Sequence, residues 1–110
     1  MKTTILSKED TDLFYVWLRN CQGVLDKFFD SNNTPLTLRD KLSADEGNRF
    51  IRIWKVGSAQ RSAWAFIDKT NLDVLKPASW KAPAKGARGN LKDSSGGMSR
   101  IQWTGPMYLR

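Results

Sequence analysis

The spacing of apolar residues changes once along the chain, and this change limits the folds that the chain can adopt. From residue 13 to residue 28, apolar side chains recur every three or four positions, which is the period of one helix face and predicts a helix over about 8–29. After Gly47-Asn48 the pattern becomes the alternation of a strand, beginning with residues 50–56. A helical region followed by several strands predicts an α+β fold.

The segment 8–29 has the signals of an amphipathic helix. Ser7 can accept a hydrogen bond at its N-cap, and the acidic residues of the first turn suit the positive end of the helix dipole. The apolar stripe includes Cys21, which we therefore interpret as a buried thiol. The other members of the stripe are Leu13, Phe14, Trp17, Val24, Leu25 and Phe28.

A second, shorter helix and three strands are expected to follow. Pro35 suits the first turn of that helix, which would continue through the leucines at 36, 38 and 42. The strands are predicted at 50–56, 61–68 and 73–76, with turns at 57–58 and 68–73. They form an antiparallel meander with one face packed on the long helix, and residues 101–103 can add a fourth strand.

Residues 77–97 separate the third strand from the end of the chain. They are poor in apolar residues and contain Pro77, Pro83 and several glycines, so a long regular element is not expected there. We predict an extended, partly mobile segment that crosses the surface.

The chain is expected to form one domain, 1–110, whose two halves differ in charge. The helical half, 1–48, holds six Lys/Arg and eight Asp/Glu, whereas the strand-rich half, 49–110, holds twelve Lys/Arg and three acidic residues. A basic half favours nucleic acid or an acidic protein surface as a partner. The alternative is that these cations only keep the protein soluble. No apolar stretch approaches the roughly 20 residues that span a membrane, so no membrane partner is expected.

The residue types that the chain lacks exclude most catalytic sites. Without histidine and with one cysteine, it cannot build a Ser-His-Asp triad, a His-ligated zinc site or an intramolecular disulfide. The paired acids Asp45 and Glu46 are interpreted as surface charge. We therefore predict a non-enzymatic protein without metal or cofactor, with a metal-dependent nuclease as the alternative. Residues 1–6 are too short and polar for a signal peptide, so a cytoplasmic location is expected.

The five tryptophans are more than the core of a small domain requires. A Trp-rich core accounts for two or three of them, and the others are candidates for interface anchors or base-stacking platforms. They are Trp17, Trp54, Trp64, Trp80 and Trp103.

The segment 76–90 is the main candidate for a binding site. Cations recur about every four residues, with small residues and one tryptophan between them, which suits a phosphate backbone and a stacked base. The strand cations Arg49, Arg52, Lys55 and Arg61 can extend this surface. The candidate residues are Arg52, Lys76, Trp80, Lys81, Lys85, Arg88 and Asn90. The simpler alternative is a solvated loop whose Trp80 packs back on the sheet.

The string Ala-Ser-Trp-Lys-Ala-Pro-Ala-Lys at 78–85 is the most specific motif, accompanied by 66–77, by Arg88-Gly89-Asn90 and by the terminal Tyr108-Leu109-Arg110. On these residues, 49–110 resembles a family of small uncharacterised proteins encoded by tailed bacteriophages. That family usually has glycine where this chain has Leu72, which implies either a strained Leu72 or a different turn. Residues 1–48 look like an addition private to this chain. The resemblance implies a phage protein in the host cytoplasm, and supplies no activity.

Two kinds of binding protein remain as predictions. The first binds nucleic acid through the basic, Trp-containing surface, with lysines and arginines on phosphates, Trp80 on a base and Asn90 in a polar contact. The second is an inhibitor or adaptor that binds an acidic surface of a host protein, through the same face or the exposed side of the helix. A minor virion component is a third possibility, and the sequence does not indicate an oligomeric state.

Overall fold

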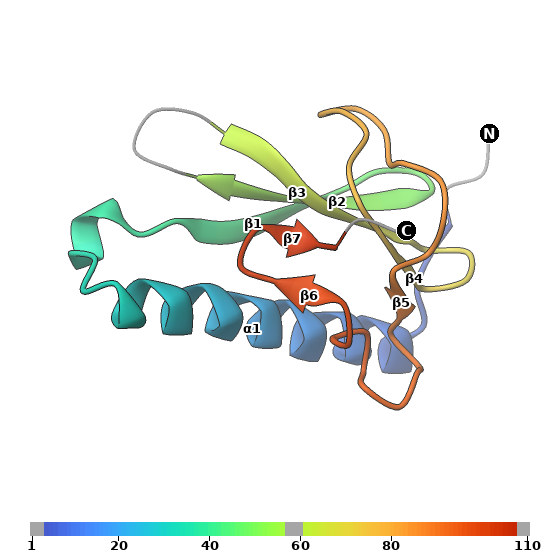
Figure 1. The fold of residues 1–110 in the computed structure, drawn as a ribbon. Helices are drawn as coiled ribbons and strands as arrows, with labels where there is room; N and C mark the ends of the chain where they lie inside the picture. The colour runs from blue at the N-terminus through green and yellow to red at the C-terminus, as the bar shows by residue number, and fades with distance from the viewer. Residues whose placement is uncertain (1–3, 57–60, 108–110) are drawn as a thin grey trace.

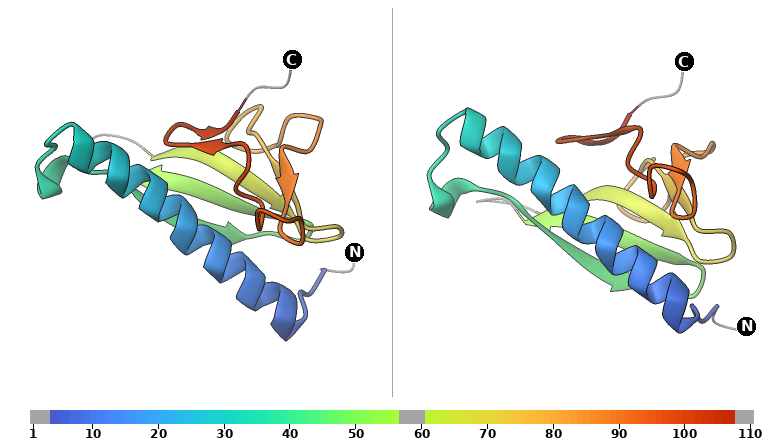
Figure 2. Two further views of the ribbon diagram at one scale, coloured as in Figure 1. Left: turned by 60° about the horizontal axis from the view of Figure 1, so that its bottom comes forward. Right: turned by 90° about the horizontal axis from the view of Figure 1, so that it is seen from below.

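The computed structural model describes residues 4–56 and 61–107, and these residues form the predicted α+β fold (Figure 1). In the described region of the chain, one long helix, α1 (Lys8–Ser31), lies along one face of a five-stranded antiparallel sheet of order β1-β2-β3-β4-β5, as Figure 2 shows from two further sides. The strands are β1 (Lys41–Glu46), β2 (Phe50–Val56), β3 (Arg61–Asp68), β4 (Asp73–Leu75) and β5 (Gly89–Asn90). A separate hairpin pairs β6 (Ile101–Gln102) with β7 (Gly105–Pro106).

The helix α1 confirms the predicted amphipathic segment and ends two residues later than expected. Ser7 Oγ accepts a hydrogen bond of 3.1 Å from the backbone N–H of Asp10, which is the predicted N-cap. Cys21 is fully buried, so its interpretation as a core thiol is confirmed, and burial raises the pKa of that thiol well above its usual range. The buried face consists of Phe14, Trp17, Cys21, Leu25 and Phe29.

The prediction of a second helix through Leu42 is wrong. Only a single 3-10 turn forms, at Leu36–Leu38, and both of these leucines are exposed. Residues Lys41–Glu46 are instead the edge strand β1, paired with β2 from Lys41↔Val56 to Glu46↔Ile51. A strand that can complete a ladder with its hairpin partner satisfies its backbone groups better than a short helix with no apolar face to bury. The sheet therefore gains a strand, and the region before Arg49 is not wholly helical.

The inner face of the sheet packs on α1 through the alternate residues of β2 and β3. Ile53 and Ile67 are fully buried there. The register of β2 and β3 shifts between Ile53 and Trp54, so that Ala65 pairs with Ile53 whereas Ala63 pairs with Trp54. Trp64 is the extra residue of this bulge, and its ring lies 6.4 Å from that of Trp17 on α1. Trp17 and Trp64 are thus both buried in the core.

The segment 77–97 contains no long regular element, only the two-residue strand β5 among turns and loops, and it is tied to the sheet at several points. Ala84 N–H donates to Lys76 O at 2.7 Å, and Pro77 bridges Pro83, so residues 76–84 form a closed loop, here the 76–84 loop. Further on, the carboxylate of Asp93 accepts hydrogen bonds from the backbone N–H of Gly97, from the hydroxyl and N–H of Ser95 and from the N–H of Asn90, which lower its pKa to about 2 although burial opposes the shift.

The C-terminal strand is present but joins a different partner from the one expected. The short strand predicted at 101–103 forms as β6, which pairs with β7 in a hairpin of its own and not with the five-stranded sheet. Gly105 lies against β3, and Trp64 Nε1 donates to Trp103 O at 3.1 Å. The hairpin therefore packs on the part of β3 that does not pair with β4. The predicted turn at 57–58 and the terminal Tyr108-Leu109-Arg110 lie outside the described residues.

Leu72 adopts the left-handed backbone that the family resemblance suggested for its position. Its φ is 67°, a region that favours glycine, and its side chain is buried in the core. Burial of the leucine therefore offsets the backbone strain, which is about 1 kcal/mol for one residue.

Candidate functional site

The outer face of the sheet, directed away from α1, carries a group of aromatic and basic side chains. Phe50, Arg52 and Trp54 alternate along β2 with the buried isoleucines, so they share this face. Phe66 of β3 lies opposite Arg52, and the rings of Phe50 and Phe66 meet edge to face at 6.2 Å. The outer face is therefore apolar at its base, with charged groups above it.

The 76–84 loop folds onto this face and places Trp80 over Arg52. The guanidinium carbon of Arg52 lies 4.1 Å from the centroid of the Trp80 ring, and Arg52 Nη1 donates to Trp80 O at 3.3 Å. The Trp54 and Trp80 rings lie 6.4 Å apart. Arg61 lies over both rings, 5.2 Å from the centroid of Trp54 and 5.9 Å from that of Trp80. These four residues, Arg52, Trp54, Arg61 and Trp80, form the Arg–Trp cluster.

The polar groups beneath the cluster are incompletely paired. Arg52 Nη2 donates to Asp45 Oδ2 at 3.0 Å, and this hydrogen bond lowers the pKa of the Asp45 carboxyl, although burial opposes the shift. The Trp54 indole N–H lies near the same carboxylate and assists slightly, without reaching hydrogen-bond geometry. Arg52 Nε and Trp54 Nε1 are buried atoms for which residues 4–56 and 61–107 provide no hydrogen-bond partner. Such donors are uncommon in folded proteins.

A pocket lies next to the cluster at the β1–β2 hairpin. It has a volume of about 250 Å³, with Phe50 and Phe66 as its aromatic wall. Its other lining residues are Asp45, Glu46, Gly47, Asn48, Arg49, Arg52 and Lys81. Arg49 is mostly exposed, although its guanidinium donates to Asp68, so the pocket opens to solvent beside a cation.

The carboxylates near this pocket each have a cationic partner. Burial alone would raise the pKa of Asp68, but hydrogen bonds from Thr70 and Arg49 outweigh it, so the pKa is lowered. Glu46 accepts a hydrogen bond of 2.8 Å from Lys69, whose side chain is fully buried. Ion pairs thus join the hairpin on one side of the pocket to Asp68 and Lys69.

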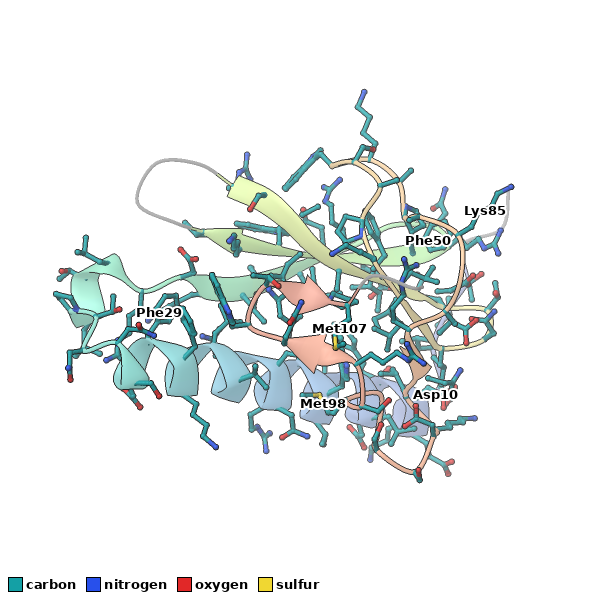
Figure 3. All side chains as sticks on the ribbon, in the orientation of Figure 1. Asp10, Phe29, Phe50, Lys85, Met98 and Met107 are labelled. Atoms are coloured by element: carbon teal, nitrogen blue, oxygen red, sulfur yellow. The ribbon has the colours of Figure 1, made fainter. Side chains whose placement is uncertain are left out.

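The predicted site residues divide into two groups. Arg52 and Trp80 come together in the Arg–Trp cluster, and Lys81 lines the adjoining pocket. Lys85 is exposed and projects outward from its loop, where Figure 3 labels it. These four residues lie on accessible surface or at its edge.

The other three predicted residues hold the loop in place. Arg88 is only 6% exposed and donates to three carbonyl oxygens, those of Lys85, Gly86 and Met107. Lys76 Nζ donates to Pro106 O at 3.0 Å, and burial, with the charge of Arg88, lowers its pKa. Asn90 Nδ2 donates to Asn71 O and to Asp73 Oδ1. In this conformation their polar groups form hydrogen bonds within the protein that stabilise the loop.

Trp54 was not among the site residues predicted from the sequence, and Arg61 was expected only as one of four strand cations that can extend the surface. The signal for Trp54 was present, because alternation along residues 50–56 places it on the same face as Arg52. The position of Arg61 over the two tryptophan rings could not be predicted, since the bulge in β3 makes it depend on pairing with β2. The alternative that Trp80 packs back on the sheet describes the observed position, yet its ring and that of Trp54 remain partly exposed.

The described residues also bear on metal binding and on membrane crossing. No three side chains of the metal-binding types gather within residues 4–56 and 61–107. In that same region of the chain, no helix has both the length and the apolar character that crossing a membrane requires.

Comparison with known proteins adds one finding. A model described as "Family of unknown function (DUF7717)" matches residues 10–109. The match includes α1 and β1, so the expectation that residues 1–48 are private to this chain is wrong from residue 10 onward. No curated protein and no solved structure matches the chain.

Proposed function

The chain belongs to this family of unknown function, and because the family supplies no activity, we propose from the surface itself that the protein binds single-stranded nucleic acid and is not an enzyme. The observation that carries the proposal is the Arg–Trp cluster, in which two partly exposed indoles and two guanidinium groups share one face of the sheet. The protein would be phage-encoded and would act in the cytoplasm of the host cell.

The cluster suits single strands because their bases are free to stack. A base can stack on an exposed indole whatever its sequence, and each such contact is worth about 1–3 kcal/mol. The exposed guanidinium group of Arg61, next to both rings, can pair with a phosphate beside that base, whereas Arg52 already donates to Asp45 and to Trp80 O and holds the ring in place. In a duplex the bases are already stacked on one another, so an indole on a sheet face cannot reach them.

The cations around the cluster supply the electrostatic component of the proposal. Arg49, Arg61, Lys81 and Lys85 are exposed, and the chain carries a net charge of +7. Lys81 Nζ has no hydrogen-bond or ion-pair partner among the side chains that the structure describes, so it is available to a phosphate. Exposed cations beside stacking rings are the combination that proteins use to bind single strands without strong sequence preference.

The salt dependence of binding tests the proposal. We expect a fluorescein-labelled single-stranded oligonucleotide to bind, measured by fluorescence anisotropy, with an affinity that falls steeply as salt rises. If roughly three to four cations contact phosphates, log K should fall with log salt concentration with a slope of about −2 to −3. A duplex of the same sequence should bind more weakly, since its bases are not available to the rings. Absence of binding to any single strand at low salt would refute the proposal.

A second candidate function is binding of an acidic surface on a host protein. Trp and Arg also dominate the energetic centres of protein interfaces. Exposed Leu36, Leu38 and Val56 lie at the end of the molecule where Trp54 lines a second pocket, which could extend an interface. A tagged pull-down from host lysate with and without nuclease separates the two. Nucleic acid lost on nuclease treatment supports the first function, and one host protein retained at equal stoichiometry supports the second.

A further inference from the structure

The pocket at the β1–β2 hairpin has a composition that differs from that of the Arg–Trp cluster. Phe50 and Phe66 form an aromatic wall, two carboxylates come from the end of β1, and cations come from the hairpin, β2 and the 76–84 loop. Figure 3 labels Phe50 beside this end of the sheet. The volume of about 250 Å³ lies just below the roughly 300–1,000 Å³ of pockets that hold drug-sized ligands. A single ring system is thus a better match than a larger molecule.

The charges that line the pocket restrict the chemistry of its ligand. Asp45 and Glu46 repel a bare phosphate, and a purely apolar ligand would leave the charged groups desolvated. A flat ligand with both hydrogen-bond donors and acceptors can pair with the carboxylates and with the cations of the pocket at the same time. Nucleobases have this character, and those with an exocyclic amino group present a donor that a carboxylate accepts.

We propose that this pocket binds one nucleobase that carries an exocyclic amino group. The proposal rests on the proposed function, because it places one base of a bound single strand in the pocket. The base would stack on Phe50, its amino group would donate to the carboxylate of Asp45, and Lys81 or Arg49 would donate to a ring nitrogen or carbonyl oxygen. Uracil and thymine present a carbonyl oxygen where the amino group would be. This oxygen would face the carboxylate of Asp45, and two acceptors cannot form a hydrogen bond.

A pair of matched ligands tests this selectivity. Oligo(dC) and oligo(dU) of equal length have the same backbone, and their bases differ at position 4, amino or carbonyl, and at N3, which accepts in cytosine and donates in uracil. At slightly alkaline pH, where cytosine is not protonated, we expect oligo(dC) to bind about fivefold more tightly, the effect of one hydrogen bond. Asp45→Asn should bring the ratio of the two affinities close to one, because an amide can donate to the uracil carbonyl. Asp12→Asn, the same change at an exposed site on α1, should leave the ratio unchanged.

The outcomes separate this proposal from the function on which it rests. If neither oligonucleotide binds, the proposed function fails. If both bind equally to the unaltered protein, the function stands and the amino-selective pocket is overturned, whatever the folding of the variant. If the preference survives in a folded Asp45→Asn variant, as judged by its thermal melt, the assignment of Asp45 is overturned.

Discussion

Replacing Gly105 by alanine is expected to lower the free energy of unfolding by about 3 kcal/mol. The φ of Gly105 is +112°, where any side chain strains the backbone by about 1–3 kcal/mol. A Cβ atom there would lie 2.6 Å from the backbone oxygen of Trp64, which is fixed in β3 and cannot rotate away. Relieving that contact requires the β6–β7 hairpin to move off β3, which loosens the packing around Trp64.

A thermal melt followed by circular dichroism measures the effect. For a domain of this size, a loss of about 3 kcal/mol corresponds to a fall in Tm of roughly 10–20 °C. Gly23→Ala is the matched control, because Gly23 lies in α1 and a Cβ atom there contacts nothing within 4 Å. The control should raise stability by about 0.5–1 kcal/mol. A Gly105→Ala variant that melts with the unaltered protein would show that the hairpin does not pack on β3 in this way.

The double variant Arg61→Glu/Lys81→Glu is expected to weaken single-strand binding about 100-fold at low salt, or roughly 2.8 kcal/mol. Both side chains are exposed, one in the Arg–Trp cluster and one at the hairpin pocket. Each substitution removes a cation from the path of the phosphates and replaces it with a repelling charge. Because neither residue is buried, the fold should be retained, and a melt of the variant checks this.

The variant Arg19→Glu/Lys27→Glu is the matched control for this effect. Arg19 and Lys27 are exposed on α1, on the other side of the sheet, and the two double variants change the net charge equally. The control variant should lose only the long-range attraction between the protein and the oligonucleotide. This loss should lower the affinity a few-fold at low salt and should fade as salt rises and screens the charges. An equal loss of affinity in both variants would mean that net charge alone drives binding and that the outer face has no special role.

The elements that were predicted correctly are those whose sequence patterns, such as apolar periodicity and capping residues, lie within the element itself. The helix α1 follows from an apolar stripe that repeats over roughly four turns and from the cap at Ser7. Strands β2 and β3 follow from alternation, and their ends match the predicted 50–56 and 61–68. The buried state of Cys21 followed from its place on the stripe. In each case the information lies within a few residues of the position concerned.

The elements that the sequence did not predict depend on distant partners. The strand β1 contains only Leu42 and Ala44 as apolar residues, and its strand conformation comes from pairing with β2. The strand β5 has two residues and pairs only because the chain returns to β4 after the 76–84 loop. Short strands of this kind carry too few residues for a periodic pattern to be visible.

The candidate site shows the same division. Spacing along 76–90 suggested that all its cations face one ligand, yet Arg88 and Lys76 turn toward the C-terminal segment and donate to its carbonyl oxygens. Only the fold shows which cations are already used. By contrast, Arg52 and Trp80 lie 28 residues apart in sequence and meet because the loop closes over β2. Their proximity was not visible in the linear pattern.

The most direct test of the proposed interface is the set of indole N–H signals in a ¹⁵N–¹H correlation spectrum during titration with a single-stranded oligonucleotide. Each of the five tryptophans gives one such signal. Trp17 and Trp64 donate to Gly97 O and Trp103 O inside the protein, so their signals should stay in place. The signals of Trp54 and Trp80 should shift together and saturate as the outer face fills. A titration in which neither of these two signals moves, or in which only that of Trp103 does, would contradict binding at the Arg–Trp cluster.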